Sequence, residues 1–222
     1  MKTVTKDYII TSPQRKGGSI LTIGGKLFWP MDARPEEVDI KDIAHALSNM
    51  CRFAGHIKKF YSVAQHCVLV SDLISKVALK DDANFISAPS LREMRLTSWK
   101  KLALLHDATE AYLVDIPRPV KAYFPEYKKV ESKLHIVLAQ AFNVGYGYKF
   151  GTFFEHPIVK KADNIALTIE ANNLVNDPKK LWCEEARFTV KEYSKYKLIP
   201  MTPSQAERAF LKRYYEVTRR GL

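Results

Sequence analysis

His106 and Asp107 are adjacent in the sequence, inside the largely apolar segment KLALLHDATEAY at residues 101–112. Both are metal-ligand residue types, and an unpaired charged group buried in an apolar helix would be costly. A divalent cation satisfies an imidazole and a carboxylate at once. His66 and Asp163 supply two further ligands of the same kinds, and each lies on a predicted helix. We therefore predict a metal centre formed by His66, His106, Asp107 and Asp163.

The donor set limits the choice of metal. Neutral imidazole nitrogens together with carboxylate oxygens suit Mn²⁺, Fe²⁺, Co²⁺, Ni²⁺ or Zn²⁺. Four protein ligands leave positions on an octahedral ion for water and a phosphate oxygen. We expect one divalent metal ion, whose identity the sequence leaves open. The alternatives are a hydrogen-bonded core pair for His106 and Asp107, a core or surface position for His66, and a solvated helix position for Asp163.

Three further residues near these ligands have side chains suited to phosphate-ester chemistry. Glu110 lies four residues after His106, so on a helix it would share the same face. A carboxylate beside a metal-bound water is placed for general acid–base catalysis, although a surface position near a helix end is the alternative. Arg52 offers a planar fork suited to phosphate, or it packs on Phe53 at the surface. Asp115, at the end of the same segment, is the third candidate, and a cap for the following turn is its alternative.

The elements that position these side chains begin with a β-hairpin over residues 19–30. Two β-rich runs, 20–23 and 26–29, flank Gly24-Gly25, a typical two-residue turn. After this hairpin the pattern becomes helical. Asp39 is predicted to cap a helix that runs to about residue 50. Ser62, with a Gln three residues later, is predicted to form a capping box for the next helix.

Further helices are predicted at about 99–113, at 127–142, from Pro157 through Leu174, and from a capping box at Ser204 and Glu207 to about residue 218. Residues 80–97 lack a clear period and contain a proline, so they are predicted as a loop or insertion, as is the Gly- and aromatic-rich stretch 146–154. No repeat or linker divides the chain. We expect one mainly α-helical domain over residues 1–222, with a small N-terminal hairpin and a metal-binding core at about 39–175.

Composition limits the partners. The formal net charge of +11 favours anionic molecules such as nucleotides, nucleic acid or phosphorylated metabolites. The basic residues occur mostly as scattered pairs, which do not indicate a nucleic-acid-binding arm. Three cysteines without a Cys-x-x-Cys pair, and a start without an apolar signal region, favour a reduced cytoplasmic protein. No apolar run approaches the roughly 20 residues of a membrane span.

Several motifs together resemble the HD-domain metal-dependent phosphohydrolases, which share the pattern His…His-Asp…Asp. The motifs are DIAHAL at 42–47, CRF at 51–53, FYSVAQH at 60–66, LLHDATEAY at 104–112, DIPRPVK at 115–121 and Ala162-Asp163. They are similar to the 5′-deoxynucleotidase (YfbR-like) branch of bacteria and phages. The resemblance covers roughly residues 42–121 and the helix around Asp163. It leaves out residues 80–97 and the chain after residue 174.

The resemblance implies an HD-domain helical bundle that hydrolyses deoxynucleoside 5′-monophosphates to deoxynucleoside and phosphate. It assigns Glu110 to proton transfer, Asp115 to a sugar contact, and the Arg52–Phe53 pair to phosphate binding and crowding of the sugar. The aromatic residue in this branch is Trp, so Phe53 implies weaker selection for deoxyribose.

Two other functions are left open by the sequence. Phage dATP triphosphohydrolases of the same branch are one alternative, and the net positive charge is compatible with both substrates. A non-enzymatic, basic nucleic-acid-binding module is the alternative from another class, although no such motif is present. We expect a small-molecule nucleotide as partner, with no membrane and no specific nucleic acid. The expected location is the bacterial cytoplasm, or the host cytoplasm for a phage protein, and a homo-oligomer is left open.

Overall fold

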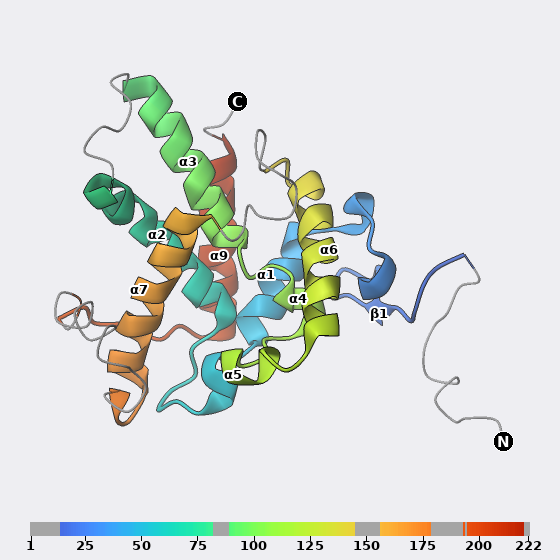
Figure 1. The fold of residues 1–222 in the computed structure, drawn as a ribbon, viewed down its shortest axis with the longest axis horizontal. Coiled ribbons are helices and arrows are strands. Elements are labelled where there is room, and N and C mark those ends of the chain that lie inside the picture. The colour runs from blue at the N-terminus through green and yellow to red at the C-terminus, as the bar shows by residue number, and fades with distance from the viewer. Residues whose placement is uncertain (1–13, 82–88, 145–155, 179–192, 194, 220–222) are drawn as a thin grey trace.

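The computed structural model describes residues 14–81, 89–144, 156–178, 193 and 195–219. Helices dominate this part of the chain (Figure 1). The longer ones are α1 (Ile40–Asn49), α2 (Val63–Asp81), α3 (Pro89–Leu105), α6 (Pro125–Ala141), α7 (Pro157–Leu174) and α9 (Pro203–Arg219). Shorter elements are α4 (Glu110–Leu113), α5 (Arg118–Lys121) and 3-10 turns at Pro30–Asp32, Pro35–Glu37 and Arg52–Gly55. Strands β1 (Ile20–Leu21) and β2 (Leu27–Phe28) form an antiparallel hairpin, so the predicted mainly α class with a small hairpin is confirmed.

Helix α2 packs against α3, α7 and α9 (Figure 1). Helix α9, near the C-terminus, also contacts α1 and α3. A buried apolar cluster extends from Phe28 in the hairpin to Phe210 in α9. The helices that carry His66 and Asp163 are therefore direct neighbours. Among the described residues, no helix is both long and apolar enough to cross a membrane.

The starts of α1 and α2 follow the predicted caps. The Asp39 side chain accepts a hydrogen bond from the backbone N–H two residues later, at 2.9 Å. The Ser62 hydroxyl accepts from the backbone N–H of Gln65 at 3.1 Å, which is half of the predicted capping box. The Gln65 amide does not close the box, because it donates to the Ile199 carbonyl and accepts from the Met201 N–H, both at 2.8 Å. These two hydrogen bonds link the segment before α9 to α2.

The hairpin turn has three residues, where the sequence predicted two. Thr22 N–H donates to the Lys26 carbonyl at 2.9 Å, and Gly25 N–H donates to the Thr22 carbonyl at 3.0 Å. Gly25 has φ +77°, a conformation that favours glycine. Gly24 is needed for space, because a Cβ there would lie 2.8 Å from Asp42 Oδ1. Gly24 N–H donates to the same oxygen at 2.8 Å, so the hairpin is anchored to α1.

The predicted loop over residues 80–97 is wrong in its second half, because α3 begins at Pro89. Proline is compatible with a first helical turn, where its missing N–H has no helical acceptor. Residues 82–88, and the predicted loop at 146–154, lie outside the described residues. The predicted helix from Pro157 to Leu174 is confirmed as α7, and α6 begins two residues earlier than predicted.

The predicted cap of the C-terminal helix is also wrong. Thr202 N–H donates to the Gln205 side-chain oxygen at 2.9 Å, and Gln205 N–H donates to the Thr202 hydroxyl at 3.4 Å. The capping box therefore starts at Thr202, two residues before the predicted Ser204. Pro203 explains the shift, since proline favours the first helical position and so places the cap on the residue before it.

Candidate active site

The His106-Asp107 pair lies on a tight turn between α3 and α4, where the sequence predicted one continuous helix over 99–113. Ala108 N–H donates to the Leu105 carbonyl, and Glu110 N–H donates to the Asp107 carbonyl, both at 3.0 Å. These are three-residue steps of the 3-10 type. The turn brings His106 Nε2 within 3.2 Å of Asp107 Oδ2, so the donor atoms of the two adjacent residues lie close together. The predicted helix on which Glu110 would share a face with His106 is therefore interrupted between Leu105 and Glu110.

Each histidine ring is held on its outer side by an acceptor. His106 Nδ1 lies 2.8 Å from the Ala103 carbonyl oxygen, and His66 Nδ1 lies 2.6 Å from Glu170 Oε1. A carbonyl and a carboxylate only accept, so both Nδ1 atoms donate and both Nε2 atoms face inward. The two Nε2 atoms are 3.3 Å apart.

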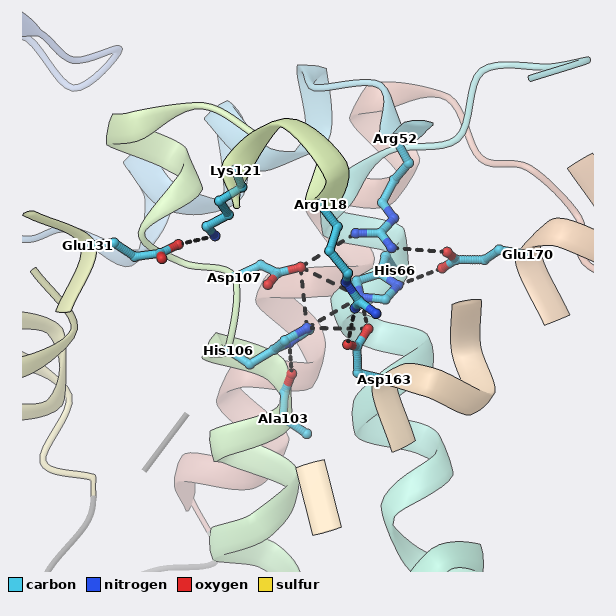
Figure 2. Close-up of polar contacts among 10 residues, drawn as sticks. All are labelled: Arg52, His66, Ala103, His106, Asp107, Arg118, Lys121, Glu131, Asp163 and Glu170. Carbon is cyan, nitrogen blue, oxygen red and sulfur yellow. Dashed lines mark hydrogen bonds and ion pairs between the residues drawn. The ribbon is translucent and has the colours of Figure 1, made fainter. Parts of the chain in front are cut away.

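Two carboxylates complete this group of donors (Figure 2). Asp107 Oδ2 is 3.6 Å from His66 Nε2, and Asp163 Oδ1 is 3.2 Å from His66 Nε2 and 4.0 Å from His106 Nε2. The donors of His66, His106 and Asp107 all lie within 4.8 Å of one another. Two ligands at right angles on an ion, each about 2.1 Å from it, are about 3.0 Å apart. The donors of His66, His106 and Asp107 therefore fit a single divalent ion, and Asp163 Oδ1, from α7, lies beside them.

The electrostatics of the site favour positive charge between the rings. Burial lowers the pKa of His106, but the charge and hydrogen bond of Asp107 outweigh burial, and the pKa is raised well above its ordinary value. Burial raises the pKa of the Asp107 carboxyl, but His106 prevails and the pKa is lowered. Burial also raises the pKa of the Asp163 carboxyl, but the hydrogen bond from His66 prevails and the pKa is lowered. Two ionised carboxylates thus face two imidazoles, a setting that a bound cation would stabilise.

Glu170 belongs to the site and was missed by the sequence analysis. Its side chain has no exposed surface, and its Oε2 accepts from Arg52 Nη2 at 3.3 Å while Oε1 accepts from His66. It lies seven residues after Asp163, two turns along α7, so both carboxylates are on one helix face. An acidic residue between the buried Ile169 and Ala171, two turns after a predicted ligand, is the signal that could have found it.

Arg52 reaches the site from the segment between α1 and α2. Its backbone N–H donates to the Tyr61 carbonyl at 2.9 Å, and its Nη1 lies 3.6 Å from Asp107 Oδ2. The side chain is only 12% exposed, and the buried Nε has no acceptor among the described residues. The next two residues, Phe53 and Ala54, have φ +55° and +50°. Such left-handed backbone is unfavourable for these residues, and strain of this kind concentrates at functional sites.

Phe53, Glu110 and Asp115 are the remaining residues that the sequence predicted for the site. The Arg52 Cζ atom lies 5.8 Å from the Phe53 ring centroid. Glu110 is 6% exposed, and burial, followed by the charges of Asp107 and Asp115, raises its pKa well above the ordinary value. Its Oε2 has no hydrogen-bond partner in the described part of the chain. Burial also raises the pKa of the half-buried Asp115, against the charge of Arg52.

A second missed residue is Arg118, which lies in the DIPRPVK motif but received no role. It belongs to α5, is 71% exposed, and its Nη2 lies 3.4 Å from Asp163 Oδ2 (Figure 2). Lys121, from the same short helix, forms an ion pair with Glu131 on α6. Helix α5 therefore adds cations at the outer edge of the site.

Comparisons with known proteins agree with this arrangement. The family model described as 5′-deoxynucleotidase YfbR-like matches residues 42–215, so the match also includes chain after residue 174. The uncharacterised protein YfdR of Escherichia coli K12 is 34% identical over 199 residues, which are 90% of this chain and 95% of YfdR. An uncharacterised protein of Rhodobacter capsulatus is 30% identical over 159 residues, covering 68% of this chain and 70% of the relative.

The family match and the geometry lead to the same assignment. The two histidines and two aspartates expected of an HD-domain site converge in space, and the model that matches most of the chain describes a family of hydrolases. The chain belongs to the YfbR-like 5′-deoxynucleotidase family of HD-domain phosphohydrolases.

Proposed function

We propose that the chain is a metal-dependent phosphohydrolase that converts deoxynucleoside 5′-monophosphates into deoxynucleoside and phosphate. The observation that carries the proposal is the convergence of four donor atoms, from His66, His106, Asp107 and Asp163, beside the buried guanidinium of Arg52. The description of the family model as a 5′-deoxynucleotidase supports the substrate class.

The four donors would hold one divalent ion, such as Mn²⁺, Co²⁺, Fe²⁺, Ni²⁺ or Zn²⁺. When bound, such an ion polarises a phosphoryl oxygen and lowers the pKa of water enough to supply a nucleophile near neutral pH. The residues around it bind the phosphate, move the proton and select the sugar.

Arg52 is assigned to the phosphate. A guanidinium has five N–H donors, of which one binds Glu170 and another faces Asp107. Two carboxylates do not use all five N–H groups, so the guanidinium keeps donors for a phosphate oxygen. Charge-assisted bonds of this kind hold the phosphate and offset the charge that builds on it in the transition state.

Glu110 is assigned to proton transfer. It takes a proton from the attacking water and passes it to the 5′-oxygen of the leaving deoxynucleoside. A carboxyl with an ordinary pKa is almost fully ionised near neutral pH, so it would rarely carry the proton that the leaving group needs. Burial raises the pKa of Glu110, which favours its protonated form.

Phe53 and Asp115 are assigned to the sugar. Phe53 follows Arg52, and its ring lies close to the guanidinium, so a sugar joined to a phosphate on Arg52 would pass beside that ring. A 2′-hydroxyl would meet the ring, and Asp115 would accept from a sugar hydroxyl. Phe is smaller than the Trp expected in this branch, so selection against ribose should be present but weak.

Hydrolysis of deoxynucleoside triphosphates is the second candidate. The observation that favours it is the exposed guanidinium of Arg118 beside Asp163, where a longer phosphate chain could gain a cationic contact. The nucleic-acid-binding alternative is not favoured, because the chain belongs to a hydrolase family. We also propose that the chain forms one domain, because the buried apolar cluster joins the hairpin to α9.

A substrate screen tests the proposal. Deoxy- and ribonucleoside mono-, di- and triphosphates are incubated with protein loaded with Co²⁺ or Mn²⁺, and products are separated by chromatography. Inorganic phosphate from monophosphates is expected, with His106→Ala protein as the control. Tripolyphosphate released from dATP without monophosphate hydrolysis would favour the second candidate. No product from any nucleotide with fully loaded protein would contradict both.

A further inference from the structure

We propose that Glu170 is a positioning residue that couples the two halves of the site, by holding the metal ligand His66 and the phosphate-binding Arg52 on its two oxygens. This inference rests on the proposed function for the role of Arg52. It adds a residue that the sequence motifs do not contain.

The geometry assigns one carboxylate oxygen to each partner. Oε1 lies 2.6 Å from His66 Nδ1, and Oε2 lies 3.3 Å from Arg52 Nη2 (Figure 2). The first contact fixes the ring orientation and the proton on Nδ1, so that Nε2 faces the other donors. The second contact holds the guanidinium 3.6 Å from Asp107, at the edge of the metal centre. A single side chain therefore determines where a ligand nitrogen and a phosphate donor lie relative to each other.

Burial makes these contacts strong and selective. The side chains of Glu170 and His66 have no exposed surface, and that of Arg52 is 12% exposed, so little water screens the charges. Burial alone would raise the pKa of Glu170, but the charges of His66 and Arg52 prevail and lower it. A buried carboxylate with two donors is stable, whereas loss of its charge leaves a buried guanidinium without its closest anion.

The covalent framework of α7 extends the coupling to a second ligand. Asp163 and Glu170 are two turns apart on one face of this helix, and both contact His66. Asp163 Oδ1 faces His66 Nε2, while Glu170 faces Nδ1 of the same ring. Helix α7 therefore places one carboxylate beside each nitrogen of the imidazole. The two-turn spacing along the helix determines how far apart the two residues begin.

Glutamine cannot replace this residue. An amide has one oxygen that accepts and one nitrogen that donates, whereas His66 Nδ1–H and Arg52 Nη2–H both need acceptors. Whichever way the amide is turned, one of the two contacts becomes a clash between donors, unless the His66 proton moves from Nδ1 to Nε2, where it would oppose metal binding. Glu170→Gln keeps the volume of the side chain, so it tests the pair of acceptors and not the packing.

The first test is metal affinity, which does not depend on turnover. Metal-stripped wild type and Glu170→Gln are titrated with Mn²⁺ by calorimetry, and circular dichroism verifies the fold. We expect roughly 10- to 100-fold weaker binding, the usual effect of losing the partner of a ligand histidine. The control is Asp42→Asn, which removes another buried carboxylate, one that accepts from Gly24 N–H in the hairpin. It should keep wild-type Mn²⁺ affinity.

The second test reads the histidine directly. In ¹⁵N spectra of metal-stripped wild type, His66 should carry its proton on Nδ1, as its contact with Glu170 requires. In Glu170→Gln this fixed tautomer should be lost or should exchange. Glu170→Asp keeps the charge but draws it back by about 1.5 Å, one carbon–carbon bond. It should bind Mn²⁺ with an affinity between wild type and Glu170→Gln.

The third test concerns Arg52. Arg52→Ala should raise KM for the hydrolysed nucleotide in wild type, and by a smaller factor in Glu170→Gln, where the guanidinium is no longer held. Equal factors in the two backgrounds would show that Glu170 does not position Arg52.

The outcomes separate this inference from the proposed function. Wild-type Mn²⁺ affinity and an unchanged His66 tautomer in folded Glu170→Gln would overturn the inference, whatever the substrate. If loaded wild type hydrolyses no nucleotide while Glu170→Gln still binds Mn²⁺ weakly, the proposed function fails and the positioning of His66 stands. If Glu170→Gln does not fold, Glu170→Asp decides, and wild-type values for both Mn²⁺ affinity and KM would overturn the inference.

Discussion

Two arginines approach different carboxylates of the same site from opposite environments. Arg52 is 12% exposed and belongs to the floor of the site, which we define as Arg52, His66 and Glu170. Arg118 is 71% exposed and belongs to the rim, defined as Arg118 and Lys121. The shortest nitrogen–oxygen distances of the two arginines to their carboxylates are similar, 3.3 Å and 3.4 Å. Distance alone therefore does not rank their contributions.

The surroundings decide the ranking. At the rim, water and salt screen the charge of Arg118, and exposed ion pairs contribute about 0–1 kcal/mol. On the floor, Arg52 is fixed by a buried carboxylate and by its backbone bond to Tyr61 before any substrate arrives. A donor fixed in advance loses little freedom when it binds. We therefore expect the floor to determine catalysis and the rim to modulate substrate capture.

The largest effect should come from the ligands themselves. His106→Ala or Asp107→Ala removes a donor and should abolish both bound metal and hydrolysis while the helical content is kept. Elemental analysis and circular dichroism measure these. His45→Ala is the matched control, because His45 pairs with Glu207 away from the site. Full metal content in folded His106→Ala protein would show that the site is assigned wrongly.

Glu110→Gln should have the next largest effect. It keeps the shape of the side chain but cannot carry the proton, so turnover should fall by roughly 10²–10⁴-fold, the usual size of an acid–base contribution. Metal content should stay at the wild-type level, as measured by elemental analysis. Glu126→Gln, at an exposed position on α6, serves as the control for loss of a carboxylate. Parallel loss of metal and turnover would make Glu110 a ligand.

Arg52→Ala should raise KM and lower kcat without changing metal content. Loss of a hydrogen bond to a charged group costs about 1.5–3 kcal/mol, which corresponds to a loss of about 10- to 150-fold in kcat/KM. Arg52→Lys should still be damaging, because the planar fork is lost. The deficit should persist at high salt. Wild-type kcat/KM for Arg52→Ala on every hydrolysed nucleotide would place Arg52 outside the site.

Arg118→Ala tests the contribution of the rim. The expected loss in kcat/KM is at most about fivefold, the equivalent of an exposed ion pair, and it should disappear as salt is raised. Steady-state kinetics at low and high ionic strength measure this for mono- and triphosphates. A loss as large and as salt-resistant as that of Arg52→Ala would remove the distinction between floor and rim.

The smallest effect should be the sugar preference at Phe53. The ratio of kcat/KM for dAMP over AMP should exceed one, and Phe53→Trp should widen it. Both aromatic residues have the same difficulty with the φ of +55° at this position, so the change reports ring size more than backbone strain. A ratio at or below one that Phe53→Trp leaves unchanged would contradict the sugar assignment.

Sequence patterns predicted what depends on local chemistry. Pro157 and the apolar spacing after it gave both ends of α7, and Asp39 gave the start of α1. The pairing of His106 with Asp107 indicated a metal centre before its geometry was known. In each case the deciding interaction lies within a few residues of the signal.

The missed features depend on contacts between distant segments. Helical spacing could not show that the chain turns between Leu105 and Glu110, because residues 101–112 are apolar enough for a continuous helix. Gln65 was read as a local cap, but its amide binds the chain near Ile199, more than 130 residues away. Glu170 contacts His66, and Arg118 contacts Asp163, although the partners are distant in the sequence. These contacts can be recognised only when the positions of α2, α5 and α7 are known.

The central claim is that His66, His106, Asp107 and Asp163 hold one divalent ion on which phosphate-ester hydrolysis depends. The most direct measurement strips the protein with a chelator, verifies the loss by elemental analysis, and titrates Co²⁺ or Mn²⁺ back while phosphate release from dAMP is followed. We expect no activity in the stripped protein and recovery that saturates at one ion per chain. Undiminished hydrolysis of dAMP by protein verified to be free of metal would contradict it.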